Sequence, residues 1–581
     1  MISKGKLGKD ARESQRRWVF RLIYFVGLAL AVWGSIQVYT GITEPIGKRI
    51  SNIMFSTMKL FLFAPTYSIK PSGSLAYELA IWICPIGTVL GFFQVFKPYL
   101  VQLRLAFSHW GAHPTIVAGA NEISLQFIET VIRDYPNEKI VLLVGDSKEK
   151  QDNAYLEDDG VRVLAFDYRL PEHPRNRALM NRFRLYRAAR IISFESDPVN
   201  FTHLESLNRV FAPCISRPIP LHMMSGSFKL KEMIEETTKN WKSFDIHFFD
   251  MDTLGALQLL ENPEYKLYTT PGLISDWNKD DLQSERSIAD KIGRCHLLLV
   301  GLGKTGRAML MESINQACVN PFSRFRVTII DKDATNCLEI FDRDIDQREK
   351  IAEIELIETD LRSNKVQKRL SEIKNVEPFT AVIYCLEDAY LSMLSIERLW
   401  GYFADSQVAV YCGGKTDVSA LLGVYNNRGQ RVISFGEAKK ILTPEHIVNE
   451  NQLLNAKSFN KSYNDTISEL LSFPPDKRDK DAQWESLTTL AKESNLAQTL
   501  HRGTKLAILE KIASVNAEDG SVARLISAFR KRLLGLSISE QVNIIEKDPV
   551  MNFLTQLEHV RWNNFQYIRN FSYAPKKRPC R

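Results

Sequence analysis

Three closely spaced glycines between an apolar run and a helical pattern constrain this chain more than any other feature. The run 297–300 leads directly into Gly301, Gly303 and Gly306, spaced as G-x-G-x-x-G, and a second apolar run ends in Asp331. Glycines at this spacing allow a tight turn and a close approach of a pyrophosphate, and the later acid reaches a ribose hydroxyl. The pattern predicts a dinucleotide-binding Rossmann unit. A Rossmann unit that uses its glycines only for packing is the alternative.

The same order of strands and helices occurs earlier in the chain. This first copy begins at T-I-V-A-G-A-N-E-I-S, and its later apolar runs end in three acids, Asp146, Asp167 and Asp197. Gly119 keeps the first glycine of the motif, whereas Asn121 and Ser124 replace the second and third. Both side chains add bulk where a pyrophosphate would lie, so we interpret this copy as degenerate, either structural or binding something altered. Strands that alternate with helices predict parallel, doubly wound sheets, with a break between the copies around residues 269–281.

In this order the two copies resemble the RCK (Trk-type N-terminal, TrkA-N) domain of potassium channels and potassium-uptake regulators. In that family a glycine turn and acids after the second and third strands surround a nucleotide. The resemblance implies that NAD or another adenine nucleotide binds at Gly301, Gly303, Gly306, Asp331 and Asp360 of the second copy. In the first copy the matching residues are Gly119, Asp146, Asp167, Asp197 and Asn200. The departures at Asn121 and Ser124 leave binding there open.

Two apolar segments precede both copies. Residues 22–43 carry no charge, and residues 79–96 lie between Glu78 and Lys97. Each segment is long enough to span a bilayer. The N-terminus is basic, with Lys4, Lys6, Lys9, Arg12, Arg16 and Arg17 before the first segment. Because basic flanks stay in the cytoplasm, we expect a multi-pass protein of a bacterial inner membrane with both termini cytoplasmic.

A shorter apolar segment, residues 52–65, lies between the two spans. It is too short to cross a bilayer, so it is either a re-entrant pore helix or an interfacial helix. With the spans it gives the layout of a two-helix potassium-channel subunit. The T-V-G-Y-G loop that coordinates dehydrated potassium is absent, and A-P-T-Y-S-I-K-P-S-G follows the segment instead. This difference argues against strict potassium selectivity.

From about residue 446 the strand signals stop and the pattern is helical. Residues 484–506 and 557–565 resemble the ryanodine-receptor (RyR) repeat, which bacteria also attach to RCK-like domains. An arginine fork and an aromatic face suit a phosphate and a base. The resemblance makes a candidate second ligand site of Trp484, Asn495, Glu558, Arg561 and Trp562. A buried Glu–Arg pair beside a core tryptophan is the alternative. The usual end of the repeat appears only as Asn570-Phe571-Ser572-Tyr573.

Composition narrows the remaining classes of function. The net charge is +7, without a basic stripe interleaved with aromatic residues, so we expect no nucleic-acid partner. Eight cysteines are scattered without a C-x-x-C or a metal-ligand spacing, which is typical of reduced intracellular thiols and gives no metal site. No substrate domain with an acid–base pair follows the Rossmann units, so we expect no enzymatic activity and no catalytic residues.

We therefore predict an α/β chain of four parts. These are a membrane domain (1–108, with spans at about 20–43 and 78–98), a first Rossmann/RCK-like domain (109–290), a second (291–445) and an all-α RyR-like domain (446–581). The expected function is nucleotide sensing in the lipid bilayer, as a ligand-gated ion channel or potassium-transport regulator that assembles as a homo-oligomer, for example a tetramer. The alternatives are an RyR-domain effector that disrupts the envelope when a nucleotide messenger binds, and a membrane-anchored NAD-dependent enzyme.

Overall fold

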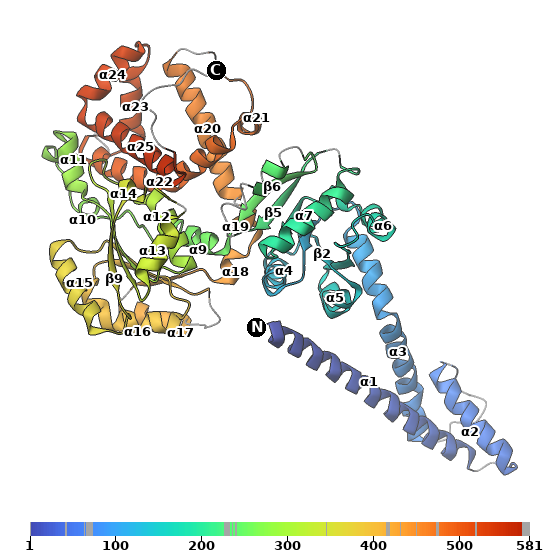
Figure 1. The fold of residues 1–581 in the computed structure, drawn as a ribbon. Coiled ribbons are helices and arrows are strands. Elements are labelled where there is room, and N and C mark those ends of the chain that lie inside the picture. Colours follow the sequence, from blue (N-terminus) through green and yellow to red (C-terminus); the bar gives the residue numbers. More distant parts are fainter. Residues whose placement is uncertain are drawn as a thin grey trace. The chain divides into compact units, whose positions relative to one another are not determined.

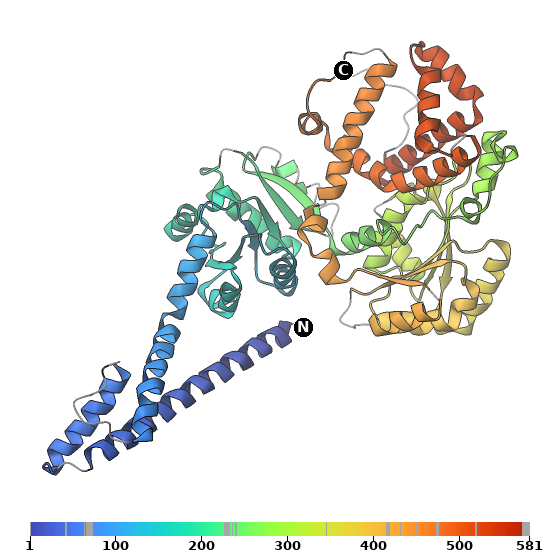
Figure 2. The same cartoon turned by 180° about the vertical axis from the view of Figure 1, so that it is seen from behind.

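The chain divides into two compact units, each of which is described separately (Figures 1 and 2). The first unit comprises Met1–Leu221 and Asn240–Asp245, and the second comprises His222–Lys239 and Ile246–Arg581. In this computed structural model the described residues are 2–40, 43–62, 64, 74–215, 217–225, 233–234, 236–238, 241–343, 345–413, 419–429, 431–448, 450–471, 474, 476–516 and 520–571.

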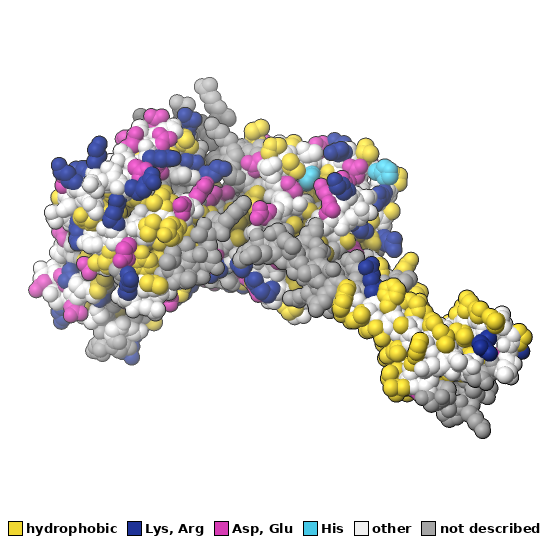
Figure 3. Space-filling view, turned by 90° about the horizontal axis from the view of Figure 1, so that it is seen from below, with side chains coloured by type: hydrophobic (Ala, Val, Ile, Leu, Met, Phe, Trp, Pro, Cys, Tyr) yellow, Lys and Arg dark blue, Asp and Glu magenta, His cyan; other side chains and the backbone are white. Residues whose placement is uncertain are grey.

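Three helices open the first unit: α1 (Ile2–Tyr39), α2 (Ile46–Phe61) and α3 (Leu75–Ser108). Within the described residues, Arg21–Tyr39 of α1 and Leu75–Phe93 of α3 are long and apolar enough to cross a membrane, which confirms both predicted candidate spans. Figure 3 shows apolar side chains over much of this helical part. These two stretches indicate a membrane protein.

The short helix α2 buries two polar side chains and exposes several apolar ones. Ser56 and Thr57 are buried, and Thr57 donates a hydrogen bond to the Ser35 hydroxyl at 3.3 Å. Phe55 and Met58 are exposed. This is the arrangement expected where the surrounding solvent is lipid, because polar groups there must bond within the protein. Residues 52–61 of the predicted short segment 52–65 lie in α2. In the stretch 64–73, which contains the end of that segment and the loop after it, only Ala64 is among the described residues.

The helices α1 and α3 pack closely against each other. A Cβ atom added to Gly34 would lie 2.6 Å from the Tyr77 Cα, so only a glycine permits this approach. The Cys84 thiol donates to the Gly27 carbonyl at 3.3 Å, which fixes a second crossing point nearer the cytoplasmic end of the predicted topology. Small residues at such contacts are the usual way in which membrane helices approach each other.

The first sheet is parallel and six-stranded, with the order β3-β2-β1-β4-β5-β6. Its strands are β1 (Thr115–Ala118), β2 (Ile140–Val144), β3 (Arg162–Ala165), β4 (Arg190–Ser193), β5 (Ile219–Met224) and β6 (Phe244–Phe249). The intervening helices are α4 (Glu122–Asp134), α5 (Ser147–Asp152), α6 (Pro174–Phe183) and α7 (Asp197–Phe211), with the 3-10 turn η1 (Ala154–Asp159). Helices between parallel strands cover the faces of the sheet, as the alternating pattern predicts.

The second sheet repeats this design with the order β12-β11-β10-β7-β8-β9. Its strands are β7 (His296–Val300), β8 (Phe325–Asp331), β9 (Ala352–Glu358), β10 (Ala381–Tyr384), β11 (Gln407–Tyr411) and β12 (Val432–Phe435). Val300 pairs with Ile330 on one side and with Tyr384 on the other, so β7 lies at the centre. The strand order reverses here, and ligands of open α/β sheets bind outside the carboxyl ends of the strands at such a point.

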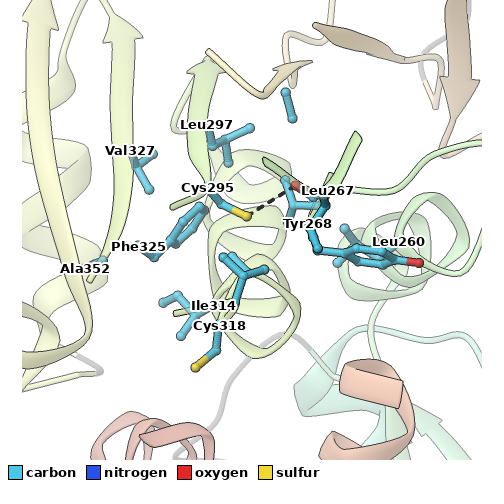
Figure 4. Close-up of a cluster of buried hydrophobic side chains, with 14 of the residues drawn as sticks. Leu260, Leu267, Tyr268, Cys295, Leu297, Ile314, Cys318, Phe325, Val327 and Ala352 are labelled. Atoms are coloured by element: carbon cyan, nitrogen blue, oxygen red, sulfur yellow. Dashed lines mark hydrogen bonds between the residues drawn. The ribbon is translucent and has the colours of Figure 1, made fainter. Parts of the chain in front are cut away.

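Three helices that precede β7 pack in the second unit: α9 (Met251–Leu260), α10 (Pro271–Ile274) and α11 (Glu285–Ile292). Gln316 of α12 (Lys304–Gln316) donates to the Leu260 carbonyl at 2.8 Å, and the Cys295 thiol donates to the Leu267 carbonyl at 3.6 Å (Figure 4). These contacts join residues before the predicted boundary at residue 290 to residues after it. The predicted domain boundaries themselves stay predictions.

The C-terminal region is helical, as the sequence predicts. Its helices are α19 (Pro444–Val448), α20 (Glu450–Leu470), α21 (Lys480–Glu485), α22 (Thr489–Asn516), α23 (Val522–Leu533), α24 (Ile538–Lys547) and α25 (Pro549–Ile568). Ile508 and Phe553 from this region share one buried apolar core with Leu310 and Ile314 of α12. The helical region is therefore continuous in its packing with the second sheet.

Candidate functional site

The three glycines of the second copy have separate structural roles. Gly301 has φ +92°, and a Cβ there would lie 2.8 Å from Leu386 Cδ2. A Cβ at Gly306 would collide with the Gly301 carbonyl oxygen, so the helix can lie close to the strand only without a side chain. A Cβ at Gly303 would meet no heavy atom of the described residues within 4 Å. The outer two glycines thus form the turn, and the middle one leaves room for a ligand.

The N-terminus of α12 is open. Gly303 is its N-cap residue, and a glycine has no side chain that could accept a hydrogen bond from the first amides of the helix. The first amides of any helix have no partner inside the helix, and they carry a partial positive charge. An anion beside Gly303 would accept hydrogen bonds from these amides and balance their partial positive charge. Phosphates bind at helix N-termini in this way.

The carboxylate of Asp331 is tied to the glycine turn. One oxygen accepts a hydrogen bond from the Leu302 amide at 2.7 Å, and the other accepts one from the Asp333 amide at 2.9 Å. A carboxylate has about four lone-pair sites, so further lone pairs remain for ribose hydroxyls. The structure thus brings the predicted acid next to the predicted phosphate position.

Asp360 lies beside these residues but is paired differently. The Thr359 amide donates to the Asp331 carbonyl at 3.0 Å, which places this segment next to the end of β8. The Arg362 guanidinium contacts both Asp360 oxygens, at 2.9 and 2.7 Å, and it holds the pKa of Asp360 below its usual range. Arg362, which the sequence reasoning did not name, adds a cation at this edge of the sheet.

A second unpredicted side chain reaches the turn from α9. The Thr305 hydroxyl in the first turn of α12 donates to Asp252 at 2.5 Å. Burial raises the pKa of Asp252. Asp252 is far from the motif along the sequence, and no local pattern links the two. Only the packing of α9 against α12 shows the contact.

In the first copy, side chains of the turn itself make hydrogen bonds to its backbone amides. The Asn121 side chain accepts from the Ser124 amide, and the Ser124 hydroxyl accepts from the Asn121 amide, both at 2.9 Å, which forms a capping box on α4. A Cβ at Gly119 would collide with the Glu195 carboxyl, and burial raises the pKa of Glu195. The side chains that replace two glycines therefore occupy the amides that a phosphate would otherwise bind.

The other matched residues of the first copy also bond locally. Asp146 accepts from the Lys148 and Glu149 amides at 2.8 Å and so caps α5. Asp167 accepts from the Arg169 amide at 2.9 Å. Asn200 donates to the Glu195 carbonyl at 2.7 Å, and Asp197 begins α7. Each side chain or position thus has a structural role within its own turn or helix.

In the C-terminal region the structure brings Glu558 and Arg561 together. Arg561 is 1% exposed, and its Nε and Nη2 lie 2.9 and 2.8 Å from Glu558 Oε1. Lys505 Nζ lies 2.5 Å from Glu558 Oε2, and Gln498 donates to Glu558 at 3.2 Å. Lys505 was not predicted, because α22 brings it from another part of the sequence.

The remaining residues of that candidate site are dispersed. Asn495 donates to Asn460 at 3.4 Å. Trp484 is buried on α21, whereas Trp562 is 46% exposed. The second ligand site therefore stays a prediction, and the closing Ser572-Tyr573 lies outside the described residues. Among the described residues, no group of His, Cys, Asp and Glu side chains could hold a metal ion.

Comparison with known proteins gives similarities only among solved structures. No protein-family model matches the chain, and no curated protein matches it. A crystal structure of GsuK bound to ADP is 13% identical, covers 76% of this chain and 99% of its own, and has a TM-score of 0.33. The GsuK channel bound to NAD is 12% identical, covers 77% of this chain and 86% of its own, and has a TM-score of 0.35. The GsuK RCK domain covers 59% of this chain and 78% of its own at 12% identity, with a TM-score of 0.33. A functional conclusion therefore has to rest on the chain's own residues.

Proposed function

We propose that this chain is a membrane-embedded nucleotide sensor, either the subunit of a ligand-gated ion channel or a regulator of potassium transport. One observation carries the proposal. The open N-terminus of α12 lies beside Asp331, in a chain that also has two helices apolar enough to span a bilayer. The resemblance of both copies to RCK domains supports the same function.

The chemistry of the second glycine turn suits an adenine nucleotide such as NAD. The amides of α12 can donate to a pyrophosphate, and Gly303 leaves space for its approach. Asp331 can accept from a ribose hydroxyl while the Leu302 amide holds it in place. We expect ligand binding without catalysis, so no residue is assigned a catalytic role.

Contacts within the first unit would carry a movement to the membrane helices. Arg104 near the cytoplasmic end of α3 donates to the Glu157 and Asp158 carbonyls at 3.1 and 2.7 Å. Lys97 pairs with the Asp158 carboxylate at 2.8 Å. These contacts hold α3 against the 3-10 turn η1, which precedes β3 of the first sheet. A ligand that favours one arrangement of the cytoplasmic domains would thereby shift the membrane helices by its differential affinity.

A pore requires more than one copy of the chain. Within one chain, α1, α2 and α3 pack on each other around Ala31, Leu60, Tyr77, Ala80 and Cys84. Three helices packed in this way have no room for a channel at their centre. We therefore propose a homo-oligomer, a tetramer being one arrangement, in a bacterial inner membrane with both termini in the cytoplasm.

Calorimetry with full-length protein in detergent tests the nucleotide site, with NAD and ADP as probes. Gly303→Asp places a carboxylate against the pyrophosphate, and its Cβ would meet no described heavy atom within 4 Å. Like charges should weaken binding roughly 100-fold or more. The matched control is Asn121→Asp at the corresponding position of the first turn. It keeps a good N-cap residue and should bind as the wild type does. Wild-type affinity in Gly303→Asp would rule out this site.

Planar-bilayer recording tests the channel function. With nucleotide present we expect a current that discriminates poorly between sodium and potassium, because the sequence lacks the carbonyl filter. Silence with confirmed insertion would favour a transport regulator that does not conduct. A strongly potassium-selective current would show that residues 64–73 form a filter after all.

A second function is favoured by one specific observation, the buried Arg561 and the partly buried Lys505 around a single carboxylate. If a nucleotide messenger binds at the C-terminal helices, the chain would be an effector that disrupts the envelope. Dye-loaded liposomes distinguish the two functions. An effector would release a large dye on addition of nucleotide, whereas a gated channel would pass ions and retain the dye.

A further inference from the structure

A buried cluster of polar side chains lies between the C-terminal helices and α12. It consists of Arg561 and Glu558 from α25 together with Gln498, His501 and Lys505 from α22, and we call these five residues the cationic cluster. Arg561 is 1% exposed and His501 is fully buried. The cluster lies within the second unit and is separate from the glycine turn.

The charges of the cationic cluster do not balance. Arg561 and Lys505 both contact Glu558, at 2.8 and 2.5 Å, so two cations share one carboxylate. Burial alone would raise the pKa of Glu558, but Lys505 and Arg561 outweigh it and hold the pKa below its usual value, which keeps the carboxylate ionised. Burial lowers the pKa of His501 to about 3, so its ring is neutral. Burial lowers the pKa of Lys505, because the charged form loses its hydration. While Lys505 is protonated, one positive charge remains, and an unbalanced charge in a partly buried place is unfavourable.

Several polar atoms of the cationic cluster also lack hydrogen-bond partners within the described residues. They are Arg561 Nη1, Gln498 Oε1 and His501 Nδ1, together with Arg561 Nη2 and Glu558 Oε2, which make only the two ion-pair contacts. Buried polar groups are nearly always satisfied in folded proteins, so such a group calls for an explanation. Arg561 Nη1 offers donors, whereas Gln498 Oε1 and His501 Nδ1 offer acceptors.

We infer that the cationic cluster binds a phosphoryl group. An oxyanion would cancel the remaining positive charge and accept a hydrogen bond from Arg561 Nη1. Arginine binds phosphate strongly in this way. A protonated phosphoryl oxygen could also donate to Gln498 or His501. The side chains of Lys505 and Glu558 are 26% and 36% exposed, so the group would enter at their edge. Inorganic phosphate and the phosphate of a nucleotide share this chemistry.

The same cluster bonds to the segment that ends α12. His501 Nε2 donates to the Cys318 carbonyl at 2.7 Å, and the Thr504 hydroxyl donates to the Gln316 carbonyl at 2.8 Å. The other end of α12 forms the glycine turn. If the proposed nucleotide function holds, the two sites lie at opposite ends of one helix, and occupancy of one should change the affinity of the other by a reciprocal factor.

Calorimetric titration of the full-length protein tests the phosphoryl site independently of the glycine turn. The background is Gly303→Asp, in which the glycine turn cannot hold a phosphate, and the probes are inorganic phosphate and ADP. Adding Arg561→Met should weaken the remaining binding about tenfold to a hundredfold, because a charged hydrogen-bond partner is lost. Arg569→Met is the matched control. Arg569 is the C-cap residue of the same helix and pairs with Glu493 at 2.8 Å outside the cluster, so its loss should leave affinity unchanged.

Glu558→Gln gives a test with the opposite sign. It removes the only carboxylate of the cluster, so phosphate should bind several-fold more tightly. A purely structural Glu–Arg pair would lose stability without any gain in affinity. If Arg561→Met does not fold, Glu558→Gln and Lys505→Met test the inference in its place. Lys505→Met should weaken phosphate binding about tenfold.

Each result is decisive for the cluster. Equal responses to phosphate and ADP would show a site that recognises the phosphoryl group alone, whereas a response to ADP only would identify a nucleotide site. Binding that is absent in the Gly303→Asp background, or that ignores all three cluster variants, would overturn the inference. If Gly303→Asp loses nucleotide binding at the glycine turn but still binds phosphate at the cationic cluster, that loss tests only the proposed nucleotide function.

Discussion

The two glycine turns of this chain have the same strand, turn and helix, yet they satisfy their backbone amides in different ways. In the first turn Asn121 and Ser124 cap α4, and Glu195 presses against Gly119. In the second turn the N-cap residue of α12 is Gly303, which has no side chain, and a Cβ there would meet no described heavy atom within 4 Å. The amides of a helix N-terminus need a partner in either case. The first turn takes its partner from its own side chains, whereas the glycine at the cap of the second turn has no side chain to offer.

The acids beside the two turns differ in the same way. Asp146 of the first copy bonds to the amides of its own helix α5, whereas Asp331 of the second copy bonds to the Leu302 amide inside the glycine turn. The second turn therefore has an acid that holds it in shape and stays available to a ribose. In the first copy a carboxyl, Glu195, stands where it would repel a phosphate.

The largest expected effect comes from the third position of each turn. Gly306→Ala would drive a Cβ into the Gly301 carbonyl oxygen, and overpacking of this kind destabilises by about 3 kcal/mol. Ser124→Ala in the first turn removes one hydroxyl of the capping box and should lower stability by only about 1 kcal/mol. Thermal unfolding of the full-length protein measures both. Equal midpoints for the two variants would show that the close packing of α12 on its strand is not essential.

The acids provide the next comparison. Asp331→Ala leaves the buried Leu302 amide without its acceptor, which should lower stability by about 2 kcal/mol and also weaken nucleotide binding. Asp146→Ala removes only a helix cap, a loss of about 1 kcal/mol, and should not affect nucleotide affinity. Unfolding and calorimetry on the same samples separate the two effects. If Asp146→Ala weakened nucleotide binding, the first turn would not be the structural one.

The middle positions of the turns should differ in how much alanine changes stability. Asn121→Ala removes the N-cap of α4 and should lower stability by about 1 kcal/mol. Gly303→Ala adds a Cβ at a negative φ where no described atom lies within 4 Å, so its stability should change by no more than a few tenths of a kcal/mol. Thermal unfolding without nucleotide measures this difference. A large destabilisation by Gly303→Ala would mean that the turn is closed in the free protein.

The sequence predicted those parts of the molecule that local patterns encode. The three glycines and Asp331 could be assigned because the order of strand, turn, helix and acid is written along one stretch of chain. The pair Glu558 and Arg561 could be found because residues three apart lie on one face of a helix. The parallel sheets followed from the alternation of apolar strands and helical stretches.

The contacts that the sequence did not predict join segments that are far apart along the chain. Asp252 reaches Thr305 from α9, Lys505 reaches Glu558 from α22, and Arg104 reaches η1 from α3. A one-dimensional pattern contains no signal for such contacts, because they depend on how the helices pack in three dimensions. The bulk of Asn121 and Ser124 was predicted, but their mutual capping became clear only from the geometry.

The smallest expected effect concerns the carboxyl that closes the first turn. Burial raises the pKa of Glu195, and the nearby Glu149 adds to this rise. The unfolded chain therefore loses its proton at a lower pH than the folded protein does. Between the unfolded and the folded pKa, stability falls as the pH rises, and above the folded pKa the whole loss is present. Glu195→Gln cannot ionise, so it should raise the unfolding midpoint slightly at neutral pH and leave it unchanged below the unfolded pKa of about 4.3. The measurement is the difference in midpoint between variant and wild type from pH 4 to pH 8, with Glu205→Gln as the control, because the Glu205 side chain on α7 is 47% exposed. A difference that does not depend on pH would mean that the Glu195 carboxyl closes the turn by its shape and not by its charge.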